Sequence, residues 1–258
     1  MAWVYCAIEG KKLIQRYLLN ETITDEINLA SNQSIFKHFG KVLRARVGTQ
    51  AEFVDNNRRV VIAEVVTITP ESMHLKVINT ISAEAELPLE ISVVVSPLKN
   101  DRSDWFVQKA TELGVHHIIF TNMARTVTDW HKQQDKKQLR FQKIAQAAAE
   151  QAHRLMVPTV QFIDWQAMIA QPKNLGLVAW EESARAGESA NLVQTIREAP
   201  HGAKIVLLFG PEGGLTTSEV TELTTSHFIS AGLGPRILRA ETAPLYALSA
   251  ISVLRELI

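Results

Sequence analysis

The chain has 258 residues, of which 46% are hydrophobic, and this suits a globular protein of one large or two small domains. Its 27 basic and 27 acidic residues give a net charge of zero. This excludes a generic polyanion binder, because non-specific affinity for nucleic acids comes mainly from neutralising phosphates. Cys6 is the only cysteine, which excludes an intramolecular disulfide and a cysteine-rich metal site.

The N-terminal ten residues are apolar, but they have no basic start and are followed by Lys11 and Lys12. They therefore do not match a signal peptide. No apolar run reaches the roughly 18 residues that a membrane span needs. We expect a cytoplasmic protein with no membrane contact.

The segment from Gln15 to about Glu86 predicts a β-rich domain. Apolar and β-branched residues alternate with polar turns in Ala51–Val54, Val60–Thr69 and Met73–Ile78. A small barrel would close the edges of such short strands. The composition changes at Glu84–Glu90, which contains a proline, so we expect a domain of residues 15–86 and a second one of residues 90–258.

A basic segment, Lys37–Arg46, lies inside this β-rich region and contains no acidic residue. It is open to two interpretations: a local RNA-binding patch, or a solvated face around a strand. Its cationic and titratable side chains are Lys37, His38, Lys41, Arg44 and Arg46.

From Ile91 onward the pattern changes to short apolar runs separated by helical stretches. Such runs are typical of parallel strands that are covered on both faces. The alternation of strands and helices predicts an α/β fold, right-handed and doubly wound. The expected strands are Ile91–Ser96, His117–Thr121, Leu175–Trp180, Lys204–Phe209 and His227–Ala231.

Four helices are expected between and after these strands. Asp101 caps the first, which runs to Leu113 and stops at Gly114. Thr216 and Glu219 form a capping box, and Pro244 suits the first turn of a last helix. The remaining helix spans residues 136–155, with an inner face of Phe141, Ile144, Ala148 and Ala152 and a polar face that includes Arg140, Lys143, Glu150 and Arg154.

Two glycine-proline loops carry the clearest signal for a ligand. Gly210–Gly214 follows an expected strand but lacks the Gly-Lys-Ser/Thr ending of a phosphate loop. Gly232–Gly234 begins like a dinucleotide fingerprint, but Ile237 stands where the third glycine belongs. A tight turn needs only one glycine, whereas the Gly210–Gly214 loop (GPEGG) contains three beside a rigid proline. We therefore favour a site lined by backbone groups, which glycine lets a ligand approach closely.

Charged residues near the second loop leave alternatives open. Arg236 and Arg239 could pair with a phosphate or a base edge, or Arg239 could form a surface ion pair with Glu241. His116 and His117 point to opposite faces of a strand, so no metal site is expected. No GxSxG motif is present, and an unpatterned hydrolytic triad stays open.

Six ordered segments then identify a family. Together with Arg125, which follows the expected strand His117–Thr121, they resemble the RsmE family of 16S ribosomal RNA uracil N3-methyltransferases, in the SPOUT superfamily. Residues 1–14 precede the family's usual start, which implies an upstream start codon or an N-terminal extension. The segments are Gln15–Tyr17, His38–Gly48 (HFGKVLRARVG), Lys99–Val115 (KNDRSDWFVQKATELGV), Ala148–Pro158 (AAEQAHRLMVP), Gly210–Glu219 and Leu233–Ala243.

The resemblance implies a PUA-like RNA-binding β-barrel and a SPOUT α/β domain with a deep trefoil knot. It implies a homodimer that binds S-adenosylmethionine (SAM) in the knot loops, largely through backbone groups. The implied cofactor-binding residues are Leu208, Phe209, Gly210, Pro211, Glu212, Gly213, Gly214, Leu233, Gly234, Ile237, Leu238, Thr242 and Ala243.

The implied reaction is methyl transfer to N3 of one specific uridine of 16S ribosomal RNA in the assembled 30S subunit. We expect Arg239 and Arg16 to stabilise negative charge on the uracil oxygens, with Glu241 a weaker candidate for the base. Two rivals are a SPOUT enzyme for another RNA or a ribose hydroxyl, and a catalytically silent RNA-binding factor. The expected RNA-binding residues are Arg16, His38, Lys41, Arg44, Lys99, Arg102, Arg125, Arg154 and Arg236.

Overall fold

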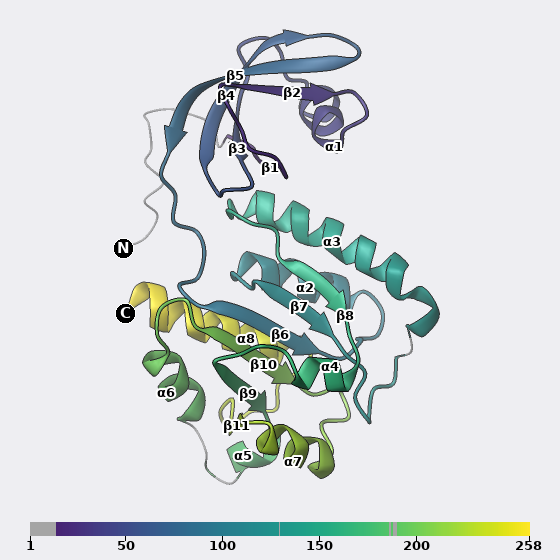
Figure 1. Cartoon of the computed structure of the whole chain (residues 1–258). Helices are drawn as coiled ribbons and strands as arrows, with labels where there is room; N and C mark the ends of the chain where they lie inside the picture. The colour runs from purple at the N-terminus through teal and green to yellow at the C-terminus, as the bar shows by residue number, and fades with distance from the viewer. Residues whose placement is uncertain (1–13, 129, 186, 188–189) are drawn as a thin grey trace. The chain divides into compact units, whose positions relative to one another are not determined.

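The computed structural model describes residues 14–128, 130–185, 187 and 190–258, which form two compact units (Figure 1). The first unit takes the described chain up to Ala85 and also the later segment Ala149–Met156; the second takes Glu86–Ala148 and Val157–Ile258. The break after Ala85 lies inside the segment expected to separate two domains. The later segment of the first unit was not predicted. The N-terminal extension, residues 1–14, lies outside the described residues except for Ile14.

The first unit is built on a five-stranded sheet with the order β1-β3-β4-β5-β2. The β1–β3 pair is parallel and the other pairs are antiparallel. The three expected strands are confirmed. β1, with three residues, is too short to show a pattern, whereas β2 alternates exposed and buried residues and was missed although the alternation is present in its sequence. The strands are β1 (Arg16–Leu18), β2 (Glu26–Ala30), β3 (Gln50–Val54), β4 (Val60–Ile68) and β5 (Ser72–Ile81).

The basic segment of this unit is largely helical, so the interpretation of it as a solvated face around a strand was wrong. Helix α1 (Ser34–Phe36) continues into the wider turns of η1 (Lys37–Val42), in which the Leu43 N–H donates to the His38 carbonyl at 2.9 Å. The buried side chains of Ile35, Phe36 and Phe39 share one side of these turns, while the basic side chains are exposed. This helical period of three to four residues was missed in the sequence because the segment is too short to show it clearly.

A buried ionic cluster joins the two chain segments of the first unit. Arg16 is 4% exposed, and its Nε donates to Glu52 Oε2 at 2.8 Å while its Nη1 donates to the His153 carbonyl. The His153 Nδ1 lies 3.1 Å from the same Glu52 oxygen. Burial by itself would raise the pKa of Glu52, but the hydrogen bond with His153 and the charge and hydrogen bond of Arg16 outweigh it, so the pKa is lowered.

This cluster predicts acid sensitivity. Because the pKa of Glu52 is lower in the folded chain, its carboxylate stabilises the fold above the unfolded pKa, and this contribution is lost as pH falls through the folded value. Between pH 7 and the unfolded pKa of a glutamate (about 4.3), this contribution should stay constant, and it should fall in more acidic buffer. Urea unfolding at a series of pH values, compared with Glu52→Gln, measures this. A Glu52→Gln variant with an unchanged acid slope would contradict it.

The second unit contains a six-stranded sheet with the order β11-β9-β10-β6-β7-β8, and every pair is parallel. The parallel sheet expected from the apolar runs is thus confirmed, with all five expected strands. The sixth, β8, escaped prediction because only Val160 within it is buried. The strands are β6 (Glu90–Val95), β7 (His117–Phe120), β8 (Thr159–Phe162), β9 (Leu175–Ala179), β10 (Lys204–Phe209) and β11 (Phe228–Ala231).

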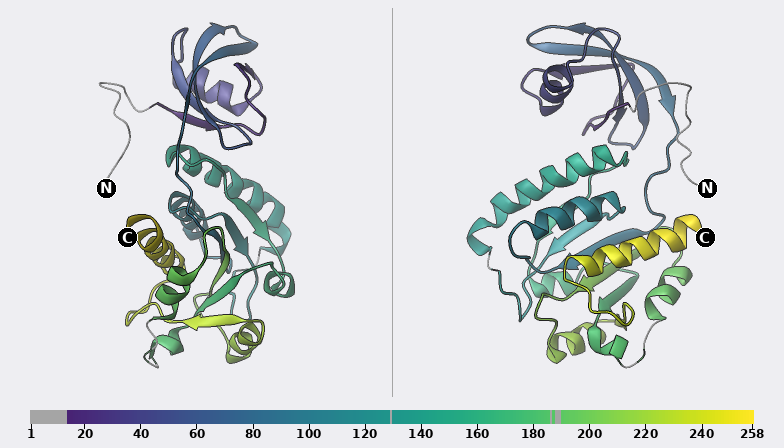
Figure 2. Two further views of the ribbon diagram at one scale, coloured as in Figure 1. Left: turned by 60° about the vertical axis from the view of Figure 1, so that its left-hand side comes forward. Right: turned by 180° about the vertical axis from the view of Figure 1, so that it is seen from behind.

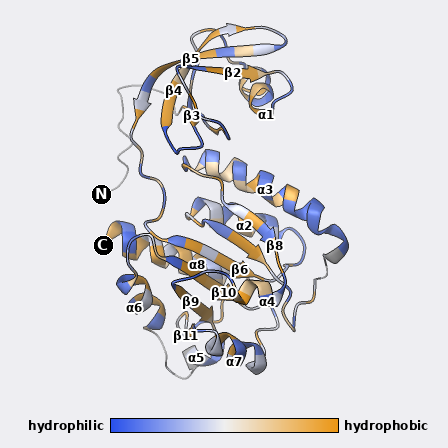
Figure 3. Cartoon of the chain, viewed as in Figure 1, coloured by the Kyte–Doolittle hydropathy of each residue, from blue (hydrophilic) through white to orange (hydrophobic). Residues whose placement is uncertain are grey.

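Helices cover both faces of this sheet, as Figure 2 shows from two sides. In β10, Ile205 and Leu207 join the core under α2, α3, α6 and α8, whereas Val206 and Leu208 join the core under α4 and α7. Apolar colour follows the strands in Figure 3 because both of their faces are buried. The helices are α2 (Arg102–Glu112), η2 (His131–Gln133), α3 (Gln134–Gln151), α4 (Trp165–Ile169), α5 (Glu181–Arg185), α6 (Asn191–Glu198), α7 (Thr217–Thr225), α8 (Thr242–Ser252) and η3 (Val253–Leu257).

Most of the helix signals are confirmed. Gly114, with φ of 88°, follows the end of α2, and the Thr216–Glu219 capping box starts α7. Asp101 stands at the cap position of α2, but its side chain accepts no capping bond. The polar face expected around Arg154 was wrong: α3 ends at Gln151, and Arg154 is 2% exposed.

In the described part of the chain, no helix is both long and apolar enough to cross a membrane. Among the same residues, no group of three or more His, Cys, Asp or Glu side chains is placed to hold a metal ion. His116 and His117 instead bond within the sheet: His116 Nδ1 accepts from the Ile91 N–H, and His117 lies beside Glu90 and Thr159.

Candidate functional site

A cavity of about 970 Å³ opens in the second unit, where the carboxyl ends of β9, β10 and β11 lie side by side. Crevices at this edge of a parallel sheet are the usual place for a ligand. The cavity is walled by the two glycine-proline loops, by the end of β9 and the residues that follow it, and by two arginines, one at the start of α2 and one in the loop after β7. Its lining is Arg102, Arg125, Ala179–Glu182, Phe209–Leu215, Leu233–Glu241 and Ala243.

The loop after β10 is held in a tight turn. The Gly214 N–H donates to the Pro211 carbonyl at 2.8 Å, and Gly214 has φ of 71°, which suits glycine. A β-carbon on Gly213 would lie 3.1 Å from Arg125 Cβ, so only glycine leaves this approach unstrained. Arg125 Nη1 donates to the carbonyls of Gly213 and Leu215 at 3.0 and 3.3 Å. Arg125, expected to bind RNA, is therefore engaged with the loop.

The capping box extends this support. Glu219 is 8% exposed, and its Oε2 accepts from the Thr216 N–H at 2.8 Å. Its Oε1 accepts from the Ala124 N–H at 2.7 Å, beside Arg125. The loop after β7 and the loop after β10 are thus tied at two points, and the backbone groups between them are positioned before any ligand binds.

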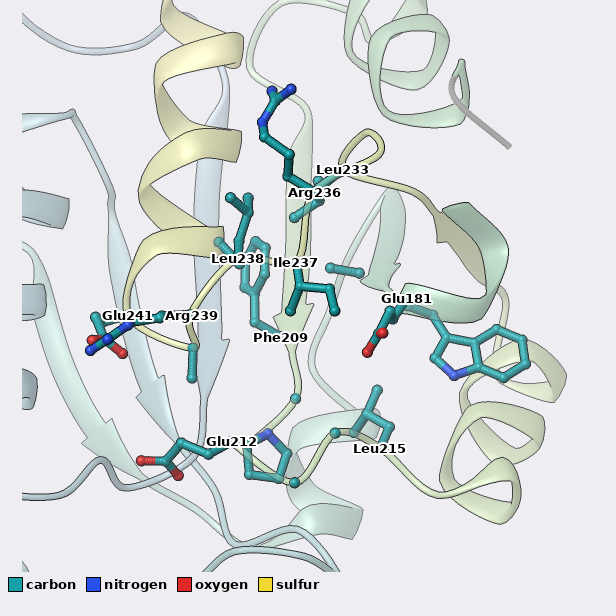
Figure 4. A pocket seen from close by; sticks show the side chains of 18 of the residues that line it. Glu181, Phe209, Glu212, Leu215, Leu233, Arg236, Ile237, Leu238, Arg239 and Glu241 are labelled. Carbon is teal, nitrogen blue, oxygen red and sulfur yellow. The ribbon is translucent and has the colours of Figure 1, made fainter. Parts of the chain in front are cut away.

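The second loop leads directly into α8. Gly234 has φ of 88°, and Ile237 is 77% exposed at the cavity wall. The Arg239 carbonyl accepts the N–H groups of Thr242 and Ala243 at 2.9 Å, which fixes its backbone at the start of the helix. In Figure 4, Arg236 and Arg239 point in different directions, and Arg239 lies on the same side as Glu241.

Opposite charges meet on one wall of the cavity. Arg102 lies between two carboxylates, with its Nη1 3.7 Å from Glu212 Oε1 and its Nε 3.7 Å from Glu241 Oε1. Glu241 is 8% exposed, and its Oε2 has no hydrogen-bond partner among the described residues. A buried carboxylate oxygen without a donor is costly. Because Glu241 also lines the cavity, a rotation of its side chain would bring this oxygen to a ligand. The recorded partner of Glu241 is Arg102, not Arg239 as one sequence interpretation had it.

The expected cofactor-binding residues all line this cavity except Leu208 and Thr242. Leu208 is fully buried in the core beneath the other face of the sheet, because side chains alternate along β10 and Phe209 faces the cavity instead. Thr242 is exposed in the first turn of α8 and is not part of the wall. The wall also includes Arg236, Arg239 and Glu241.

Other expected residues lie elsewhere. Arg16 belongs to the buried cluster of the first unit, where Glu52 and the His153 carbonyl occupy its guanidinium, so the catalytic role expected for it does not fit. Arg154 is buried, which removes it from any surface that RNA could contact. Lys99, His38, Lys41 and Arg44 are exposed.

Sequence reasoning missed the wall that follows β9. Ala179, Trp180, Glu181 and Glu182 border the cavity, and Figure 4 shows Glu181 across from Glu241. One signal could have found them: they stand at the carboxyl end of an expected central strand, where α/β proteins place their ligands. Without the strand order, its position beside β10 was unknown.

Comparison with known proteins agrees with this geometry. Residues 85–252 match the family model described as an RNA methyltransferase domain. The ribosomal RNA small subunit methyltransferase E of Bacillus subtilis is 36% identical over 253 residues, 95% of this chain and 98% of the relative. A crystal structure of a protein described as hypothetical is 34% identical, with a TM-score of 0.87 over 94% of this chain and 99% of that one.

One similar solved structure also has a bound ligand. The ribosomal RNA small subunit methyltransferase E of Neisseria gonorrhoeae, bound to S-adenosyl methionine, is 29% identical, with a TM-score of 0.81. The alignment covers 93% of this chain and 98% of that chain. The chain has a cavity between two glycine-proline loops, contains the matched domain and is similar to relatives over nearly its whole length. It therefore belongs to the RsmE family of ribosomal RNA small subunit methyltransferases.

Proposed function

We propose that this protein transfers a methyl group from SAM to N3 of one specific uridine of 16S ribosomal RNA in the assembled small subunit. The observation that carries the proposal is the cavity between the Gly210–Gly214 and Leu233–Glu241 loops. SAM is the methyl donor, as the ligand of the Neisseria relative indicates. The uracil target and the assembled subunit rest on the motifs that the chain shares with its family.

The residues present fit SAM. The cavity volume is at the upper end of the range for small-molecule sites, about 300–1,000 Å³, which leaves room for a second reactant. Three of the five residues of the Gly210–Gly214 loop are glycines, which let a ligand approach the backbone, and Arg125 holds the loop in place. The carboxylate of Glu212 offers acceptors to a cationic ligand with amino and hydroxyl groups.

The chemistry divides between cofactor and protein. When bound, SAM supplies an electrophilic methyl group on a sulfonium. The protein must hold uracil N3 in line with that methyl, and such positioning removes a large part of the barrier. Arg239, at the cavity wall, stabilises negative charge on the uracil oxygens as the N3 proton leaves. Glu241 Oε2 accepts that proton, while Arg102 holds the other carboxylate oxygen.

The basic helical turn of the first unit is the proposed RNA-binding surface. Lys37, His38, Lys41, Arg44 and Arg46 are all exposed there, next to the exposed apolar side chains of Val42, Leu43 and Val47. The Tyr17 hydroxyl lies 2.9 Å from His38 Nδ1, and burial followed by the charge of Glu150 raises the pKa of Tyr17. The phenol therefore stays protonated and orients the His38 ring.

The remaining family properties are proposed on the same basis. The five-stranded sheet is the proposed PUA-like barrel, and the segment from β10 to α8 the proposed trefoil knot. The protein is proposed to be a cytoplasmic homodimer with its site near the subunit interface. Light scattering at micromolar concentration should give twice the chain's 28.8 kDa, and a monomeric mass would contradict the dimer.

The reaction is tested with small ribosomal subunits from a strain that lacks this enzyme. The purified protein is incubated with them and methyl-labelled SAM, the RNA is digested, and the labelled nucleoside is identified by mass spectrometry. Labelled 3-methyluridine at one site is the expected result. Another methylated nucleoside would overturn the target, and SAM binding without label would favour a silent assembly factor.

A separate prediction tests Glu241. Replacing Glu241 with glutamine should lower turnover by about 10²-fold, because the amide of glutamine cannot accept the uracil N3 proton. The loss should shrink as pH rises, since solvent then removes that proton. Single-turnover rates over a pH series provide the measurement. Glu212→Gln, measured at saturating SAM because Glu212 also faces the cofactor, is the matched control: Glu212 shares Arg102 but is more exposed. Equal, pH-independent losses in both variants would make Glu241 a structural residue.

A further inference from the structure

A second cavity, of about 500 Å³, lies at the carboxyl ends of β6, β7 and β8. It is bordered by the residues that immediately follow each of these strands. Nothing in the proposed reaction uses it. Its lining is Pro97, Phe120, Thr121, Asn122, Gln134, Phe162, Ile163, Asp164 and Trp165.

The chemistry of this lining selects against phosphate and in favour of a base. Among the described residues neither lysine nor arginine lines the cavity, and Asp164 would repel an anion. Aromatic side chains and the amides of Asn122 and Gln134 are instead the groups that proteins use to stack and hydrogen-bond an unpaired nucleobase. A carboxylate accepts best from an exocyclic amino group, such as that of cytosine.

The aromatic groups are held rigidly. The Trp165 indole N–H donates to Glu222 Oε2 at 2.8 Å, and the Phe162 ring stacks on Phe120 with centroids 5.1 Å apart. Both Trp165 and Phe162 remain half-buried. A platform fixed in this way binds a planar ligand with little loss of side-chain entropy.

One polar group in the wall lacks a partner. Thr121 is 2% exposed, and its Oγ1 has no hydrogen bond among the described residues. The side chain of Asp164, in contrast, already accepts the Ala167 N–H at 2.8 Å through Oδ1, which fixes it at the start of α4. A buried hydroxyl without a partner is unfavourable, and a ligand group at this end of the cavity would relieve it.

The two cavities share an edge of the sheet and one loop. Thr121 and Asn122 border the second cavity, and Arg125, three residues further on, borders the first. An unpaired RNA strand that follows this edge would present neighbouring nucleotides to both. We propose that the second cavity binds a nucleobase bearing an exocyclic amino group, next to the target in the RNA substrate. This inference rests on the proposed function for the identity of the RNA.

Direct binding tests the pocket without the reaction. Single-stranded oligo(A), oligo(C) and oligo(U) of about six nucleotides are titrated into the full-length protein by fluorescence anisotropy. The expected result is about tenfold tighter binding of oligo(A) or oligo(C) than of oligo(U), a preference lost in Asp164→Asn, which keeps a capping side chain. Equal affinities for all three, or an unchanged preference in Asp164→Asn, would overturn the proposal.

Methylation of small subunits supplies the second readout. Gln134→Ala and Asp164→Asn should raise the KM for subunits by about tenfold, with turnover and SAM affinity unchanged. An unchanged KM in both variants would overturn the pocket's role. Failure of the proposed function looks different: the wild-type protein would not methylate subunits, yet it would still prefer oligo(A) or oligo(C) through Asp164.

Discussion

Replacing Arg239 with alanine is expected to lower the single-turnover rate of methyl transfer by roughly 10²–10³-fold and to leave SAM affinity nearly unchanged. The side chain lies at the cavity wall at the start of α8, where it can face the developing charge on the uracil oxygens. A contact made mainly in the transition state affects the rate and not the binding of the cofactor.

Two further variants make the Arg239 result specific. Arg239→Lys keeps the charge but loses the planar fork, so it should recover only part of the rate. Arg236→Ala removes a neighbouring cation that points elsewhere, and it should act on the KM for RNA more than on the rate. SAM affinity is measured by calorimetry. A parallel loss of rate and SAM affinity in Arg239→Ala would make this arginine structural.

The second large effect is expected on stability. Arg16→Met should lower the free energy of unfolding of the first unit by about 3–5 kcal/mol, because it leaves the Glu52 carboxylate buried without its main partner. Urea unfolding provides the measurement, and Arg46→Met is the matched control because Arg46 is exposed. The double variant Arg16→Met/Glu52→Leu should recover much of the loss, since no buried charge remains.

The Arg16 variant also separates two roles. A normal free energy of unfolding with a large loss of turnover would return Arg16 to the catalytic role that the sequence suggested. Loss of stability, with normal turnover per folded molecule, would support the buried cluster. The structure favours the second result, because Glu52 and the His153 carbonyl already hold its guanidinium.

The second unit was largely predictable from the sequence because its signals are local. Its central strands are buried on both faces and show as continuous apolar runs, and the Thr216–Glu219 capping box is a four-residue pattern. The order of the strands is not local. For this reason the wall after β9, with Glu181 and Glu182, was missed although the strand itself was expected.

The errors have a common physical cause, which is long-range pairing. Nothing near Arg16 or Arg154 in the sequence shows that each is buried. Glu241, for which one interpretation of the sequence proposed an ion pair with Arg239, instead lies beside Arg102. Leu208 stays a prediction: its side chain lies in the core on the other face of the sheet, but the binding expected there is through backbone groups. Pairs of charged side chains that meet across the fold can be identified only from the three-dimensional structure.

The discontinuous make-up of the first unit has a consequence for how the chain folds during its synthesis. Ala149–Met156 belongs to this unit, and His153 lies 101 residues after the Glu52 that it contacts. As the chain leaves the ribosome, the strands β1 to β5 emerge long before this segment. Domains usually fold in order from the N-terminus, but here the Arg16–Glu52 pair of the nascent unit lacks its His153 partner until the later segment emerges. A fragment ending at Ala85 should therefore be retained by chaperones and cleaved by proteases more readily than the full chain.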